Sequence, residues 1–159
     1  CDIMNIVPTN TPYNSLILKK NITSLQNSYK FLSIDTIGKS VLNNEIYAIR
    51  LGNGPNNIFY SGSFHANEWI TSVLLMHFVE EYCNAYASNS SILGYSISKL
   101  FNSTSIYIVP MVNPDGVDLI NGNLNKNTVF YKNVLKISRK FNNIPFPNRL
   151  EIKYSSVRT

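Results

Sequence analysis

The sequence predicts an α/β fold with helices flanking a sheet. Short apolar runs with the two-residue alternation of strands recur along the chain, and segments with the three-to-four-residue spacing of amphipathic helices lie between them. With 159 residues, of which 44% are hydrophobic and 14% charged, the chain is long enough for one globular domain with its own core.

The first half of the chain is expected to contain a helix followed by strands. Residues 1–14, with two prolines, are expected to form a linker or arm, and apolar residues at helical spacing predict a helix over 15–29. The next segment, 31–37, is typical of a strand. Period-two alternation predicts another strand over 45–51, and a turn rich in Gly and Asn leads to a short buried strand over 58–61.

The second half begins with a long helix after Gly62. Its spacing places one stripe of residues on the same face, namely Ile70, Val73, Leu74, His77, Phe78 and Glu81. The pattern breaks at 89–91, and a second, short helix is predicted over 92–101. The β-branched and aromatic residues of 104–112 predict a further strand. In such α/β sheets functional residues gather at the carboxyl ends of strands.

Charge and cysteine content exclude few functions. The net charge of +5 would suit an anionic partner, but the basic residues are scattered and no aromatic-basic motif accompanies them, so we expect a solvated lysine-rich surface and no nucleic-acid partner. Cys1 and Cys83 are too few for a disulfide-stapled domain, and Cys83 is expected to be a buried free thiol. No apolar run reaches the roughly 18 residues that span a membrane, and no signal peptide is recognisable.

The segment GSFHANEW, residues 62–69, carries the strongest chemical signal. His65 leaves the end of a predicted strand, and Glu68 follows three residues later in the first turn of a helix. This i,i+3 separation places both side chains on one side, so an imidazole nitrogen and a carboxylate oxygen can reach one zinc ion at about 2 Å each. Taken alone, the pattern is also compatible with a Glu that only complements the helix dipole or completes a capping box.

A second segment favours the metal interpretation. Asn113-Pro114-Asp115-Gly116 follows the next predicted strand; alone, it would be an ordinary β-turn. Together, the two segments resemble the zinc carboxypeptidase family. The resemblance extends to about Arg149 and includes residues 7–10, 37–41, 46–49 and 109–119. It is closest to the bacterial branch that cleaves γ-D-glutamyl-diaminopimelate bonds in peptidoglycan peptides.

This resemblance implies a fold, a cofactor and a substrate class. The sheet would be the incomplete mixed sheet of the N-terminal half of the zinc carboxypeptidase fold, with residues 15–149 as the N-terminal portion of the catalytic domain and 150–159 as a divergent or truncated tail. His65 and Glu68 would bind zinc, and a peptide or peptidoglycan stem peptide would be the substrate. A LysM domain upstream and a secreted or envelope-associated location in a bacterium are further expectations.

The resemblance has two departures. Digestive carboxypeptidases carry Arg where this chain has Asn67, which argues against digestive exopeptidase specificity. The third zinc-binding His and the general-base Glu of the family have no counterpart in the chain. His77 is the other histidine, but it lies more than two helical turns beyond Glu68 and is expected in the core. We therefore expect the chain to be a fragment that binds zinc weakly and is inactive alone.

Two other interpretations stay open. A non-catalytic module that keeps the fold in order to bind peptidoglycan peptides would need a well-packed C-terminus, whereas residues 142–159 have an irregular pattern. A degenerate gene product would also account for the departure from the family pattern after Arg149.

Overall fold

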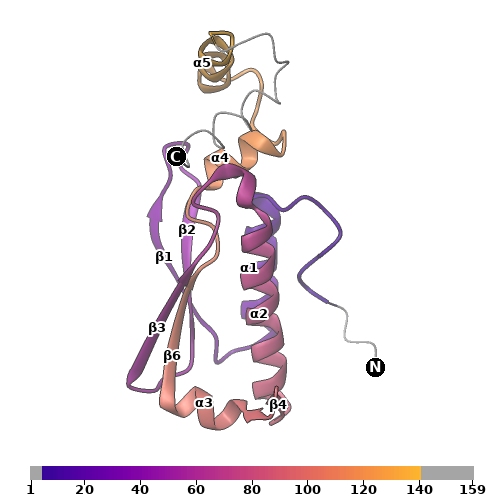
Figure 1. Cartoon of the computed structure of the whole chain (residues 1–159), viewed down its shortest axis with the longest axis vertical. Coiled ribbons are helices and arrows are strands. Elements are labelled where there is room, and N and C mark those ends of the chain that lie inside the picture. Colours follow the sequence, from indigo (N-terminus) through magenta and orange to yellow (C-terminus); the bar gives the residue numbers. More distant parts are fainter. Residues whose placement is uncertain (1–4, 141–159) are drawn as a thin grey trace.

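The computed structural model describes residues 5–140, and these residues form a mixed four-stranded sheet with two long helices on one face (Figure 1). The α/β prediction is confirmed. The elements are α1 (Ser15–Ser28), β1 (Ser33–Lys39), β2 (Glu45–Leu51), β3 (Asn56–Ser61), the 3₁₀ turn η1 (Ala66–Glu68), α2 (Ile70–Ala87), β4 (Ser91–Ile92), β5 (Tyr95–Ser96), α3 (Ile97–Ser103), β6 (Thr104–Val109), α4 (Pro114–Ile120) and α5 (Val129–Ser138).

The sheet has the order β1-β2-β6-β3. The pairs β1/β2 and β2/β6 are antiparallel, whereas β3 and β6 are parallel and pair from Asn56/Thr104 to Ser61/Val109. Because parallel strands end at the same edge of a sheet, the segments that follow β3 and β6 meet there, beside α4 at the upper end of Figure 1. The two motifs singled out in the sequence are these two segments.

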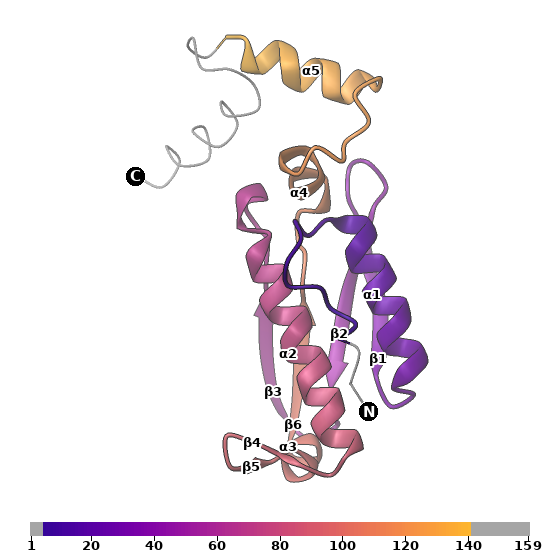
Figure 2. The ribbon, with the colours of Figure 1, turned by 90° about the vertical axis from the view of Figure 1, so that its right-hand side faces the viewer.

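The core lies between the sheet and the helices, and Figure 2 shows α1 and α2 side by side in front of the strands. Most of the side chains that fill this layer are aliphatic, and they come from both helices and from the two central strands. The fully or almost fully buried members include Leu18, Ile22, Leu25, Ile49, Leu51, Val73, Met76, Val79, Ile106 and Ile108.

The predicted apolar stripe of α2 is only partly the buried one. Val73 is buried, but Ile70 and Leu74 are 58% and 69% exposed, and the core side instead carries Met76, Val79 and Cys83. The helix is apolar around most of its circumference, so periodicity alone cannot select the face that meets the sheet. His77, expected in the core, is half-buried.

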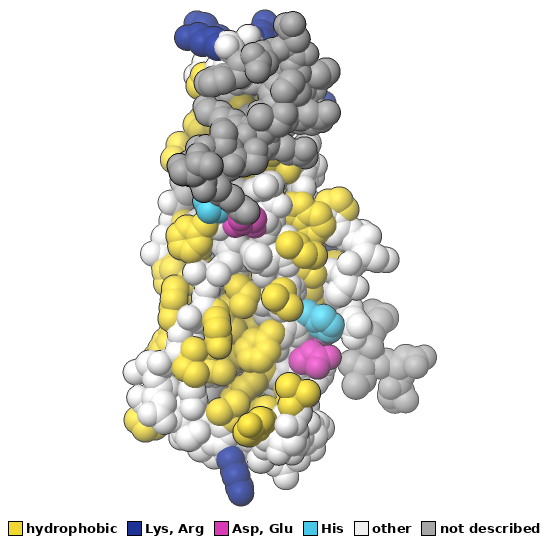
Figure 3. Space-filling model, viewed as in Figure 1, with side chains coloured by type: hydrophobic (Ala, Val, Ile, Leu, Met, Phe, Trp, Pro, Cys, Tyr) yellow, Lys and Arg dark blue, Asp and Glu magenta, His cyan; other side chains and the backbone are white. Residues whose placement is uncertain are grey.

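The second difference concerns β3, which was predicted to be buried but forms the edge of the described sheet. Ile58, Phe59 and Tyr60 are 40%, 64% and 47% exposed. Beside them, Tyr60, Leu74, Leu75 and Phe78 line a hollow of about 300 Å³. Figure 3 shows hydrophobic side chains gathered between β3 and α2. We call this surface, comprising β3 and the outward side of α2, the apolar edge.

A hairpin replaces the first half of the helix predicted over 92–101. Leu93 and Gly94 connect β4 to β5 and both have positive φ, 50° and 82°, as a two-residue hairpin turn requires, so only Ile97–Ser103 is helical. The strand predicted over 104–112 ends at Val109 because Pro110 has no N–H to donate. Helix α5 was not predicted. Residues 141–149 of the predicted domain and the tail 150–159 lie outside the described residues.

The segment before α1 packs against the helices. Val7 and Tyr13 are buried, and the buried carboxylate of Glu80 on α2 accepts hydrogen bonds from the backbone N–H groups of Ile6 and Val7 at 2.6 and 3.0 Å. The prediction for Cys83 is confirmed: it is a buried free thiol. No helix within residues 5–140 combines the length and apolarity needed to cross a bilayer.

Candidate metal centre

The structure brings His65 and Glu68 together where the chain passes from β3 to α2. His65 has an extended backbone, with φ −94° and ψ 139°, and the 3₁₀ turn η1 then rotates Glu68 to the same side. The backbone N–H of Glu68 donates to the carbonyl of His65 at 3.1 Å. Nδ1 of His65 and Oε2 of Glu68 are 3.0 Å apart.

This separation fits two ligands of one zinc ion. Donor atoms about 2.0–2.1 Å from a tetrahedral zinc lie roughly 3.3 Å from each other. The His65 and Glu68 side chains are 50% and 29% exposed, so an ion can reach both donors from solvent. An imidazole nitrogen and a carboxylate oxygen are also a donor combination common at zinc.

The described residues supply these two donors and no third one. Within residues 5–140, no group of three or more His, Cys, Asp and Glu side chains is placed to hold a metal ion. His77 is not part of such a group with the pair among these residues. Its Nδ1 is buried and has no hydrogen-bond partner among the described residues.

Backbone hydrogen bonds extend the β3/β6 pairing into the loop that carries the two side chains. Gly62 donates to the carbonyl of Val109 at 3.0 Å and accepts from Val112 at 3.0 Å, and Asn113 donates to the carbonyl of Ser63 at 3.1 Å. A Cβ at Gly62 would lie 2.9 Å from the carbonyl oxygen of Pro110, closer than side-chain carbons approach. The glycine thus permits the close contact that anchors the loop.

Hydroxyl groups around this loop were not recognised in the sequence. Thr71 on α2 accepts from the backbone N–H of Ser63 at 2.8 Å and donates to the carbonyl of Glu68 at 2.7 Å. Ser63 and Ser72 are buried and their hydroxyls are 2.6 Å apart. The turn between β3 and α2 brings these hydroxyl groups together. In the sequence, the clustering of Ser and Thr near the motif was the signal that could have indicated their role.

The segment Asn113–Gly116 is the beginning of α4 rather than an isolated β-turn. Asn113 is the N-cap, and its Oδ1 accepts from the N–H of Gly116 at 2.9 Å, while Pro114 occupies the first helical turn. The side-chain amide of Asn113 also donates to the carbonyl of Phe64 at 3.3 Å. The second motif thereby contacts the loop that carries His65.

The two carboxylates near the start of α4 bind other parts of the fold. Asp115 accepts from the hydroxyl of Ser40, the N–H of Leu42 and the side-chain amide of Asn44, at 2.6, 2.9 and 2.9 Å. Asp118 accepts from the N–H and hydroxyl of Ser15 at 2.9 and 2.6 Å. Asp115 thus holds the β1/β2 turn and Asp118 the start of α1.

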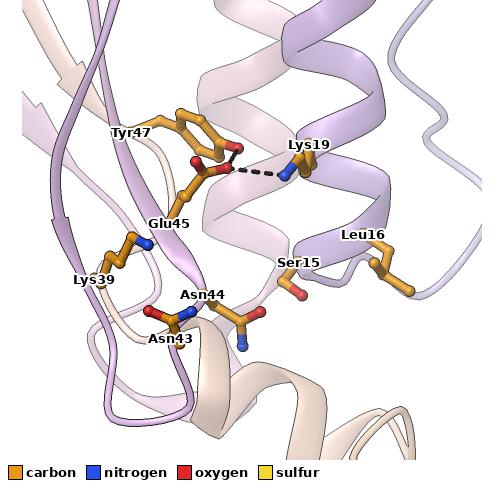
Figure 4. A pocket seen from close by; sticks show the side chains of 8 residues that line it. All are labelled: Ser15, Leu16, Lys19, Lys39, Asn43, Asn44, Glu45 and Tyr47. Atoms are coloured by element: carbon orange, nitrogen blue, oxygen red, sulfur yellow. Dashed lines mark hydrogen bonds and ion pairs between the residues drawn. The ribbon is translucent and has the colours of Figure 1, made fainter.

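A separate cavity of about 280 Å³ lies between α1 and the β1/β2 hairpin and does not include His65 or Glu68 (Figure 4). Its carboxylate, Glu45, is already bound by Lys19 at 3.0 Å and by the hydroxyl of Tyr47 at 2.5 Å. The hydrogen bond from Tyr47 and then the one from Lys19 lower the pKa of Glu45, while burial and then Glu45 raise the pKa of Tyr47 to about 12. The remaining lining residues are Ser15, Leu16, Lys39, Asn43 and Asn44.

Comparison with known proteins identifies the family of this chain. The zinc carboxypeptidase family matches residues 18–143. Gamma-D-glutamyl-L-diamino acid endopeptidase 1 of Lysinibacillus sphaericus is 46% identical over 108 residues, which are 68% of this chain and 27% of that protein. Protein YqgT of Bacillus subtilis (strain 168) is 42% identical over 110 residues, 68% of this chain and 29% of that protein. The chain thus spans under a third of the length of these relatives.

The fold is shared with solved structures as well. Thrombin-activatable fibrinolysis inhibitor superposes with a TM-score of 0.63 over 76% of this chain and 31% of its own, at 20% sequence identity. At this identity the likeness concerns the fold alone. Because the family match covers most of the chain and includes both motifs, this protein belongs to the zinc carboxypeptidase family.

Proposed function

We propose that this chain contributes to a zinc-dependent peptidase that hydrolyses γ-D-glutamyl-diaminopimelate bonds of peptidoglycan peptides. The observation that carries the proposal is the pair His65 and Glu68, whose donor atoms lie 3.0 Å apart on the accessible loop after β3. Membership of the zinc carboxypeptidase family supports zinc as the metal.

The chain's own residues account for part of the chemistry. Nδ1 of His65 and the carboxylate of Glu68 would hold the ion, and the negative charge of Glu68 would offset part of the ion's charge. Zinc, when bound, polarises the scissile carbonyl and makes a bound water more acidic. Hydrolysis also requires a third protein donor and a general base, which we assign to none of the described residues. We therefore expect little turnover by this chain alone.

The substrate class is proposed from two observations. The relative from Lysinibacillus sphaericus is named for a γ-D-glutamyl-L-diamino acid bond and is 46% identical over the matched residues. The second observation is Asn67, which is exposed next to Glu68. A neutral amide cannot form the bidentate ion pair with a terminal carboxylate that an arginine can form. Asn67 therefore favours cleavage that does not depend on a free substrate carboxylate at this position.

The substrate also suggests where the protein acts. A peptidoglycan peptide is found in the cell envelope, so we propose a secreted or envelope-associated bacterial protein, with a LysM domain as a further part of the proposal. The net charge of +5 is compatible with an anionic wall and does not require a nucleic-acid partner.

A chimera tests the proposal directly. Residues 18–143 of this chain replace the corresponding segment of the Lysinibacillus sphaericus endopeptidase, which supplies the remaining length of the domain. We expect the chimera to cleave a γ-D-glutamyl-diaminopimelate peptide, to lose activity with a chelator and to regain it with zinc. The variants His65→Ala and Glu68→Ala should abolish cleavage, whereas Glu45→Gln, a carboxylate outside the site, should not.

Two results would contradict the proposal. A folded chimera that cleaves the peptide equally well after His65→Ala would show that the pair does not hold the catalytic metal. A folded chimera that binds the peptide but does not cleave it would favour the alternative, a module that only binds peptidoglycan peptides.

A further inference from the structure

One side-chain hydroxyl joins both ends of the loop that carries His65 and Glu68. Oγ1 of Thr71, in the first turn of α2, accepts from the N–H of Ser63 at 2.8 Å and donates to the carbonyl oxygen of Glu68 at 2.7 Å. Ser63 precedes His65 by two residues, and Glu68 is itself one of the pair. The hydroxyl therefore fixes the distance between the two ends of this loop.

The direction of the neighbouring hydrogen bonds makes Thr71 the principal donor to Glu68. The hydroxyl of Ser72 lies 2.6 Å from the carbonyl oxygen of Pro110, which can only accept, so Ser72 uses its one proton there. The hydroxyl of Ser63, 2.6 Å from Oγ of Ser72, must then donate to Ser72. Its other two neighbours are farther away, the carbonyl of Glu68 at 3.3 Å and Oγ1 of Thr71 at 3.5 Å. The carbonyl of Glu68 receives its short hydrogen bond from Thr71.

The backbone of the loop needs this restraint. Ser63 has a φ of 52°, in the left-handed region that a residue other than glycine seldom adopts. Such a conformation persists only where its surroundings impose it. At Ser63 these are the hydrogen bonds from its N–H to Thr71 and from its hydroxyl to Ser72, and the one that its carbonyl accepts from the N–H of Asn113. Without the hydroxyl of Thr71, the N–H of Ser63 and the carbonyl of Glu68 both lose this partner, so the restraint on the loop between them is weakened.

We infer that Thr71 is a positioning residue for metal binding, because its hydroxyl holds the donor atoms of His65 and Glu68 at the spacing that one zinc ion requires. This inference rests on the proposed zinc site. Residues that orient metal ligands typically change metal affinity by roughly 10- to 100-fold when they are replaced. We therefore expect Thr71→Val, which keeps the shape but removes the hydroxyl, to weaken zinc binding about tenfold. Thr71→Ser should retain the affinity.

The experiment is a zinc titration of the full chain, in which NMR monitors the imidazole signals of His65. The matched control is Thr23→Val, because the hydroxyl of Thr23 also donates to a helical carbonyl, that of Lys19 at 3.0 Å, but on α1. Urea denaturation of each variant separates a loss of folding stability from a loss of affinity. We expect Thr23→Val to bind zinc like the unsubstituted protein.

Equal zinc affinity of folded Thr71→Val and the unsubstituted protein would overturn the inference while leaving the zinc site in place. If zinc does not perturb His65 in the unsubstituted protein, the zinc site and the inference both fail. A second measurement does not depend on the fold of a variant. If the loop conformation held by Thr71 favours zinc binding, bound zinc must favour that loop conformation to the same extent. Zinc should therefore slow hydrogen exchange of the Ser63 amide in the unsubstituted protein. An unchanged exchange rate would overturn the inference.

Discussion

The role of Asp115 can be tested by the single change Asp115→Asn. Asp115 belongs to the second sequence motif, yet its carboxylate binds the β1/β2 turn. Asn has almost the same shape but replaces one oxygen with an N–H₂ group that cannot accept. The less costly orientation keeps the amide oxygen toward Ser40 and Asn44 and turns the nitrogen toward the N–H of Leu42, so two donors then face each other.

The expected loss of stability follows from these three bonds. The hydrogen bond to Leu42 is lost, and a bond to a charged acceptor contributes about 1.5–3 kcal/mol. The hydrogen bonds from Ser40 and Asn44 remain, but their acceptor is now neutral, and a hydrogen bond to a neutral acceptor is roughly half as strong as one to a charged acceptor. Because the site is half-buried, water can solvate part of what is lost. We therefore expect the free energy of unfolding to fall by about 2–3 kcal/mol.

Urea denaturation followed by fluorescence of Trp69, the single tryptophan, measures this change. A loss of this size should lower the midpoint by about 1 M. Glu45→Gln is the control, because its ion pair with Lys19 lies at the surface, where solvent screens it, and should change stability little. Unchanged stability of Asp115→Asn would refute the structural role, and lost zinc binding with unchanged stability would indicate a metal-site role instead.

Two further predictions concern the core and the apolar edge. Burial, and then the charge of Glu80, raise the pKa of the Cys83 thiol from 9.0 to about 12. Between pH 9 and 12 the folded protein therefore keeps the thiol proton that the unfolded chain loses, so the free energy of unfolding should fall as pH rises through this range. The urea midpoint should fall less steeply with pH for Cys83→Ala. At the apolar edge, β3 is the outermost strand of the described sheet and carries no charged side chain, so the chain should self-associate. Phe59→Lys should shift its size-exclusion elution to the monomer, and unchanged concentration-dependent association would contradict this role of the edge.

Local patterns were sufficient where a single rule decides the structure. The alternation over 45–51 predicted β2 with its observed bounds, and helical spacing predicted α1 to within one residue. The juxtaposition of His65 and Glu68 also followed from local geometry, because two side chains separated by three positions on a helical turn lie on the same side, whatever the rest of the fold.

Features that depend on distant partners could not be predicted in this way. The buried side of α2 depends on where the sheet lies, and a helix that is apolar on several sides does not reveal this. The exposure of β3 depends on strand order, which its apolar sequence does not specify. Thr71 looks like any threonine in an early helical turn, and its contact with Ser63 exists only because the chain reverses between β3 and α2.

The proposal that His65 and Glu68 bind zinc is tested most directly by X-ray absorption spectroscopy of the zinc-loaded chain. We expect nitrogen and oxygen neighbours at about 2.0–2.2 Å, with the outer-shell scattering of an imidazole, and no sulfur shell near 2.3 Å. This imidazole signal should disappear in His65→Ala. A sulfur shell, or an imidazole signal that persists in His65→Ala, would contradict the claim.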